Sequence, residues 1–152
     1  MVKITILSYK SRKYATVFDW LIRLWTVSKY SHSEIIIGTS RYASIPNKGV
    51  CKINKNIIDS EAWDKQEFTV TKEQADKAKE FIKAQLGKKY DWKAIFLTFI
   101  FPFKSHNSNK WFCSELVAAT INAMGISLKF SRPSRVHPKK LYNTVKRYLN
   151  EC

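Results

Sequence analysis

The segment Trp111–Met124 is apolar on nearly every side, and it constrains the fold more than any other part of the chain. In the run WFCSELVAATI, apolar residues continue from Leu116 through Ala119 and return at Ile121. A helix that is apolar all round has to be buried in a core, and the Gly125 that follows is a common helix-ending residue. The rest of the chain is therefore expected to pack around this helix.

Short strands precede most of the helices in this sequence. Strands are expected at Val2–Ser8, Ser31–Gly38, Arg41–Ile45, from Gly49, and at Gln66–Val70. Helices are expected around Val17–Trp25, from Thr71 to Gly87 with a Thr71/Gln74 capping box, over Tyr90–Phe101, over Trp111–Met124, and from Pro138. This order predicts an α+β fold in which an antiparallel sheet packs against helices. The length of 152 residues, 45% of them hydrophobic, predicts one domain over residues 1–152.

The chain is strongly basic. It has 27 Lys and Arg residues against 12 Asp and Glu residues, a formal net charge of +15. Such an excess favours anionic partners, such as nucleic acid, an anionic lipid surface or an acidic polymer, although a well-solvated basic surface is an equal reading. We find no nucleic-acid recognition motif and no dense basic stripe, so no specific nucleic-acid partner is predicted. Nothing in the sequence indicates the oligomeric state.

The three cysteines, Cys51, Cys113 and Cys152, have no regular spacing. They predict reduced thiols rather than a disulfide framework, and no Cys/His cluster predicts a metal or other cofactor. The N-terminal apolar run is too short for a signal peptide, and the longest apolar stretch, Ala94–Phe103, is too short for a membrane span. These observations predict a cytoplasmic protein, and they suit a phage or bacterial accessory protein.

Cys113 falls at the start of the buried helix, directly after a polar loop. Unpaired N–H groups and the helix dipole at this position favour a thiolate. The alternative is an ordinary core cysteine, which is common. A catalytic thiol also needs a base, so the three histidines decide between the two readings.

His32 is the strongest candidate base, because it opens the apolar strand HSEIIIG. His106 lies in a polar loop and His137 adjoins Pro138, so both are expected at the surface. Residues two apart on a strand share a face, which places Glu34 beside His32. A carboxylate there would orient or charge-stabilise the imidazole. The alternatives are a strand-end histidine without a catalytic role and a carboxylate exposed to solvent.

Three segments carry a resemblance to a known family. In order, they are the His strand SHSEIIIG, the segment GKKYDW and the helix start WFCSELV. Together they resemble the circularly permuted branch of the NlpC-type, papain-like cysteine hydrolases, which includes YiiX-like proteins and relatives of lecithin:retinol acyltransferase. In that branch the His strand precedes the Cys helix, as His32 precedes Cys113 here. The resemblance implies a papain-like fold, with the nucleophile at a helix N-terminus.

The resemblance also implies a role for each matching residue. Cys113 corresponds to the nucleophile, His32 to the base and Tyr90 to a tyrosine that helps the oxyanion site. The third polar member of the family lies on the strand after the His strand, where this chain offers Ser44. Ser44 orients an imidazole less well than His, Asn or Glu does, and Glu34 stands where the family usually has a small residue. Glu34 and Ser44 therefore remain alternatives for the third catalytic position.

These residues predict a thiol hydrolase that needs no cofactor. The expected reaction is acyl transfer from an amide, as in a peptidase or amidase acting on cell-wall peptides. One alternative is a lipid-directed thiol acyltransferase or esterase at an anionic membrane surface, favoured by the aromatic Tyr14–Tyr30 segment and the net charge. Another is a basic binding protein in which Cys113 only fills the core.

Overall fold

The computed structural model describes residues 1–13, 15–54, 58–91 and 109–151. Four sequence features lie outside these ranges: the apolar stretch Ala94–Phe103, His106, Cys152, and the helix expected over Tyr90–Phe101 apart from its first two residues. Within the described part of the chain, no helix is both long enough and apolar enough to cross a membrane.

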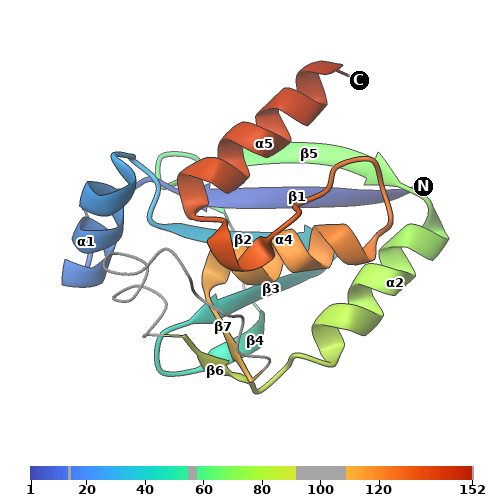
Figure 1. The fold of residues 1–152 in the computed structure, drawn as a ribbon, viewed down its shortest axis with the longest axis horizontal. Helices are drawn as coiled ribbons and strands as arrows, with labels where there is room; N and C mark the ends of the chain where they lie inside the picture. Colours follow the sequence, from blue (N-terminus) through green and yellow to red (C-terminus); the bar gives the residue numbers. More distant parts are fainter. Residues whose placement is uncertain (14, 55–57, 92–108, 152) are drawn as a thin grey trace.

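A five-stranded antiparallel sheet forms the centre of the molecule (Figure 1). Its strands run in the order β4-β3-β2-β1-β5, so the N-terminal strand lies inside the sheet, between β2 and β5. The strands are β1 (Val2–Tyr9), β2 (His32–Ile37), β3 (Ser40–Ile45), β4 (Gly49–Ile53) and β5 (Trp63–Val70). All five expected strands are confirmed, which bears out a mixed α+β fold with an antiparallel sheet.

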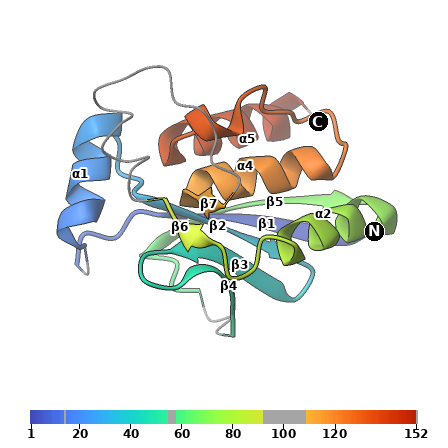
Figure 2. The same ribbon diagram turned by 60° about the horizontal axis from the view of Figure 1, so that its bottom comes forward.

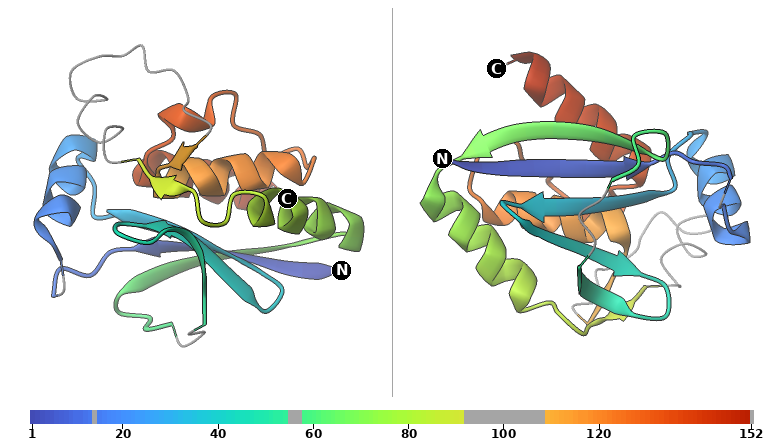
Figure 3. Two further views of the ribbon diagram at one scale, coloured as in Figure 1. Left: turned by 90° about the horizontal axis from the view of Figure 1, so that it is seen from below. Right: turned by 180° about the vertical axis from the view of Figure 1, so that it is seen from behind.

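Three helices cover one face of this sheet, as the views along and below it show (Figures 2 and 3). They are α2 (Lys72–Lys83), α4 (Cys113–Ala123) and α5 (Pro138–Glu151), with a short 3-10 turn at Pro133–Arg135 before α5. The fourth helix, α1 (Val17–Thr26), lies beyond the end of the sheet. The Thr71/Gln74 capping box of α2 is confirmed, because Gln74 N–H donates to Thr71 Oγ1 at 3.2 Å.

The core lies between the sheet and α4, as the apolar segment predicts. Leu116, Val117 and Ile121 of α4 are fully buried against Ile35 and Ile37 of β2. Burying each such side chain contributes roughly 1.5–3 kcal/mol. Because α4 is fixed by this contact, its first residue, Cys113, has a fixed position relative to β2.

A second, two-stranded parallel sheet was not expected from the sequence. It pairs β6 (Lys89–Tyr90) with β7 (Lys110–Trp111), and it joins the segment that carries Tyr90 to the segment that leads into α4. Gly49 of β4 holds β6 in place through a close backbone approach. It has φ +69°, and an added Cβ would lie 2.1 Å from the Lys88 carbonyl oxygen.

Candidate functional site

His32 and Glu34 come together because they are two residues apart on β2. His32 Nε2 lies 3.2 Å from Glu34 Oε1, as expected for residues that share a strand face. Both side chains are largely removed from solvent, with 16% of His32 and 5% of Glu34 exposed. The imidazole therefore has a buried carboxylate on one ring nitrogen, which leaves Nδ1 for another partner.

The other oxygen of the Glu34 carboxylate is bound by Arg41 on the neighbouring strand β3. Arg41 Nε donates to Glu34 Oε2. Its guanidinium carbon lies 5.1 Å from the centre of the Trp63 ring, and the Trp63 ring meets the His32 ring edge-on at 6.1 Å. These four residues form one packed polar and aromatic cluster, in which Glu34 is held from two sides.

Cys113 contacts this cluster through His32. It is the first residue of α4 and is fully buried. Burial acts to lower the pKa of His32, but the charge of the Cys113 sulfur, its hydrogen bond to the ring, and Glu34 outweigh that effect and raise the pKa to about 10. The imidazole beside the sulfur therefore binds a proton more tightly than a free imidazole does.

The contact between Glu34 and His32 shifts the pKa of Glu34 in the opposite direction to that of His32. Burial would raise the pKa of its carboxyl group, but the hydrogen bond and charge of His32, together with Arg41, lower it. Glu34 is therefore an anion at neutral pH. A buried carboxylate that faces an imidazolium stabilises the charged form of His32.

Tyr90, on β6, also packs beside Cys113. Its side chain is 7% exposed and packs in a cluster with Ile22, Phe112 and Cys113. Burial, followed by the negative charges of Cys113, Asp19 and Asp91, raises the pKa of Tyr90 well above its usual value. The phenol therefore keeps its proton at neutral pH and is a hydrogen-bond donor close to the sulfur.

Ser44 has a different partner. Its hydroxyl donates to the Trp111 carbonyl oxygen at 2.7 Å, which links β3 to β7. Of the two residues proposed for the third position, Glu34 contacts the His32 ring, whereas Ser44 supports the strand that leads into α4. His137, at the start of α5, packs edge-on against Trp25 at 5.9 Å.

A pocket of about 290 Å³ opens beside this site. His32 and Glu34 line it, and its apolar walls come from Tyr9, Phe18, Ile22, Ile45, Pro46 and Trp63. Pockets of this kind, apolar with a few converging polar groups, are where small ligands usually bind. His32 lines the pocket, whereas Cys113 is not among the lining residues.

Two members of the site were missed by reasoning from the sequence, Arg41 and Trp63. A signal for Arg41 was present, because a two-residue turn at Gly38 and Thr39 sets the register in which Ile36 pairs with Arg41. That register places Arg41 diagonally across from Glu34. Trp63 gave no such signal, since it reaches the cluster from β5, which pairs with β1 and not with β2 or β3.

No known family model matches this chain, and no curated protein matches it significantly. Within the described ranges, no group of three or more His, Cys, Asp or Glu side chains is arranged to hold a metal ion.

Proposed function

We propose that this protein is a thiol hydrolase with Cys113 as nucleophile, His32 as base and Glu34 as the residue that orients His32. One observation carries the proposal: a continuous chain of contacts from the Glu34 carboxylate through the imidazole to the Cys113 sulfur. A nucleophile, a base within hydrogen-bond reach and a third group that orients the base form the usual constellation for acyl transfer. The proposed substrates are amides, as for a peptidase or amidase.

The proposed reaction begins with the Cys113 proton on His32. The thiolate attacks the carbonyl carbon of the substrate, and the negative charge moves to the carbonyl oxygen. N–H groups at the start of α4 and the Tyr90 hydroxyl stabilise this oxyanion. When the tetrahedral intermediate collapses, the C–N bond breaks, His32 gives its proton to the leaving amine, and a thioester remains on Cys113. Water, deprotonated by His32, then releases the acid and restores the thiol.

The sequence resemblance supports the same proposal. A permuted papain-like domain would bring its base from an early strand and its nucleophile from a later helix, and here His32 opens β2 while Cys113 begins α4. The additional carboxylate, Glu34, would replace the third family member at the position of Ser44. Arg41 would act as a positioning residue, since it donates to Glu34.

A second candidate function follows from the apolar pocket. Six apolar or aromatic side chains line the space beside His32, and such a surface suits an acyl chain better than a polar peptide. A thiol esterase or acyltransferase acting on lipids would use the same three catalytic residues. The difference lies in the leaving group, an alcohol in place of an amine.

Selective alkylation tests the thiol chemistry without a known substrate. In a Cys51→Ser/Cys152→Ser background, iodoacetamide labels only Cys113, and the rate is followed by mass spectrometry from pH 5 to pH 9. We expect labelling well below the pH at which an ordinary thiol reacts, and a fall of about tenfold or more in the neutral-pH rate for His32→Gln. Cys113 is fully buried, so the same measurement shows whether reagents reach the sulfur.

Substrate panels then separate the two candidates. Matched short-chain and long-chain acyl amides and esters are offered to the wild type, with Cys113→Ala as the control. Amide cleavage lost in Cys113→Ala supports the peptidase or amidase, and cleavage of long-chain esters alone supports the lipid enzyme. A thiol that reacts no faster than free cysteine, in a folded protein that cleaves none of the panel, contradicts both and favours a binding protein.

A further inference from the structure

Helix α1 exposes a stripe of large apolar side chains, defined here by Val17, Trp20, Leu24 and Val27. Their exposed fractions are 73%, 52%, 78% and 80%. The spacings of three, four and three residues place them on one side of the helix. Isolated apolar residues are common on protein surfaces, but an aligned stripe of four marks an interaction surface.

The opposite side of α1 is bound to the protein. Arg23 is 5% exposed and donates from Nη2 to the Ser11 carbonyl oxygen at 2.7 Å and to Ser31 Oγ at 3.2 Å. Phe18 and Ile22 line the pocket beside His32. One helix therefore borders the candidate active site with one face and presents the apolar stripe with the other. Its place beyond the end of the sheet leaves it outside the layer formed by α2, α4 and α5 (Figure 1).

Val27, the last member of the stripe, has an unfavourable backbone. It caps α1 in the left-handed conformation, at φ 45° and ψ 57°, where glycine or asparagine is usual and a β-branched residue is rare. Its side chain is 80% exposed, so burial within the described chain does not offset the strain. Strained backbone that local packing does not explain is typical of functional positions.

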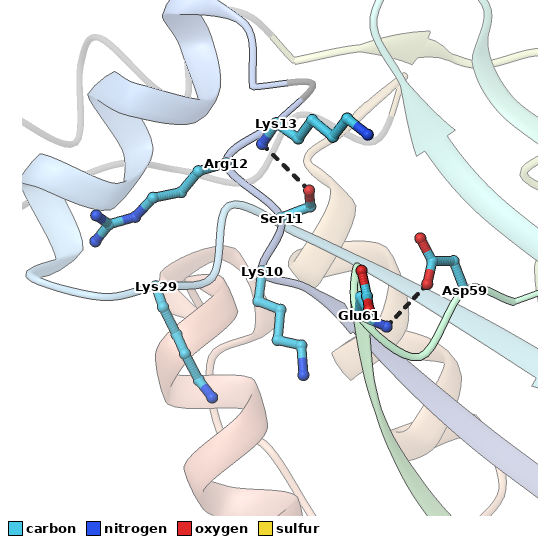
Figure 4. A pocket seen from close by; sticks show the side chains of 7 residues that line it. All are labelled: Lys10, Ser11, Arg12, Lys13, Lys29, Asp59 and Glu61. Carbon is cyan, nitrogen blue, oxygen red and sulfur yellow. Dashed lines mark hydrogen bonds between the residues drawn. The ribbon is translucent and has the colours of Figure 1, made fainter.

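Cationic side chains flank both ends of the stripe. Arg12 and Lys13 precede α1, Lys29 follows it, and all three residues are exposed. The Arg12 guanidinium carbon lies 5.8 Å from the centre of the Trp20 ring, so charge and stripe are adjacent. Together with Lys10, the three cations line a hollow of about 510 Å³, to which Asp59 and Glu61 also contribute (Figure 4).

We infer that this face of α1, with its flanking cations, docks on an anionic lipid surface. An apolar stripe that inserts below the headgroups and cations that remain among the phosphates are the two requirements of an interfacial helix. A net charge of +15 favours an anionic surface and disfavours a second copy of the same basic chain as the occupant. Docking does not depend on the thiol, and it would hold the pocket beside His32 across α1 from the membrane, about one helix diameter away.

Vesicle flotation tests this inference on the full chain. Vesicles of phosphatidylcholine containing phosphatidylglycerol are compared with vesicles of phosphatidylcholine alone, at low and at physiological salt. We expect the protein to float with the anionic vesicles only, and less at higher salt. Trp20→Ser/Leu24→Ser should weaken partition by about tenfold or more, given the transfer free energy of two large apolar side chains.

Charge variants provide the matched comparison. Arg12→Gln/Lys29→Gln removes two cations beside the stripe, and Lys140→Gln/Lys146→Gln removes two exposed cations from α5. The first pair should weaken binding several-fold more than the second. Equal effects would show that binding follows net charge alone and would overturn the inference.

The other occupants of the stripe give different results. A concentration-dependent dimer that disappears in Trp20→Ser/Leu24→Ser would identify a second copy of the chain. A large fall in the melting temperature of that variant would show that the stripe packs within its own chain. Either result overturns the inference. Cys113→Ser should float like the wild type, so a failure of the proposed catalysis and a failure of docking are distinguishable.

Discussion

Glu34 divides its carboxylate between two strands, with Oε1 on His32 of β2 and Oε2 on Arg41 of β3. Each oxygen of the carboxylate thus has its own partner, and the two contacts together fix the orientation of the carboxylate toward the imidazole. The arrangement also keeps a buried anion neutralised by a guanidinium that is itself 8% exposed. A buried ion pair of this kind contributes little net stability, but removing one partner is costly because the other charge is left unpaired.

Substitutions of Glu34 and Ser44 should have opposite effects, because we propose only Glu34 for the third catalytic position. Glu34→Gln keeps the shape of the side chain and removes the charge that stabilises imidazolium, so we expect a loss in kcat/KM of roughly 10²-fold or more. Ser44→Ala should leave kcat/KM near the wild-type value and lower the free energy of unfolding by about 0.5–1.5 kcal/mol, because the Trp111 carbonyl loses one donor and keeps the Asp91 N–H. Kinetics and urea unfolding on both variants separate the roles, and the reverse pattern would assign the third position to Ser44.

Tyr90 should matter for acyl transfer and not for the nucleophilicity of the thiol. Tyr90→Phe removes one oxyanion donor, and we expect kcat on an amide or ester substrate to fall by about 10- to 10²-fold. Alkylation of Cys113 by iodoacetamide passes through no oxyanion, so its rate should stay the same. If both rates fall together, Tyr90 acts on the sulfur itself, and the oxyanion role is wrong.

The ionisation of His32 predicts a pH dependence of stability. Its pKa is raised from 6.5 to about 10 in the folded protein. A raised pKa stabilises the fold fully below pH 6.5, and this contribution is lost as the pH rises from 6.5 to about 10. Urea unfolding over that range should show a steeper decline in the wild type than in His32→Gln. Cys113→Ala should show an intermediate slope, because Cys113 is the strongest of the groups that raise the pKa. Equal slopes in all three would contradict the contact.

Replacing Val27 by glycine should stabilise the protein. A left-handed residue with a Cβ costs roughly 1–2 kcal/mol, so Val27→Gly should raise the free energy of unfolding by about 1 kcal/mol. Leu24→Gly is the matched control, since Leu24 is similarly exposed but lies inside the helix, where glycine destabilises by about 0.5–1 kcal/mol. Denaturant unfolding of both variants measures the difference. A loss of stability in Val27→Gly would show that the Val27 side chain packs on the protein.

Local patterns were enough to predict much of this molecule. The apolar run Leu116–Ile121 is recognisable as a buried helix because its apolar residues leave no face for solvent, and the strand period of two placed Glu34 beside His32. The capping box of α2 followed from Thr71 and Gln74. A second capping box, formed by Thr16 and Asp19 at the start of α1, was overlooked although its spacing is the same.

Contacts between segments that are distant in the sequence could not be predicted from local patterns. The contacts of Ser44 with Trp111, and of Arg41 with Trp63, depend on strand order and on the register of several hairpins at once. The two-residue strands β6 and β7 have no periodicity to detect. The exposure of the α1 stripe could not be predicted either, because the sequence of an amphipathic helix does not show which face packs against the rest of the protein.

The position of β1 has a consequence for how the chain folds during synthesis. This strand is made before both of its partners, which are β2, about thirty residues later, and β5, about sixty residues later. Such distant pairing makes folding slow compared with a helical bundle. Cys113 and the rest of α4 follow all five strands of the sheet in the chain, so the core face of the sheet stays uncovered until α4 has been made.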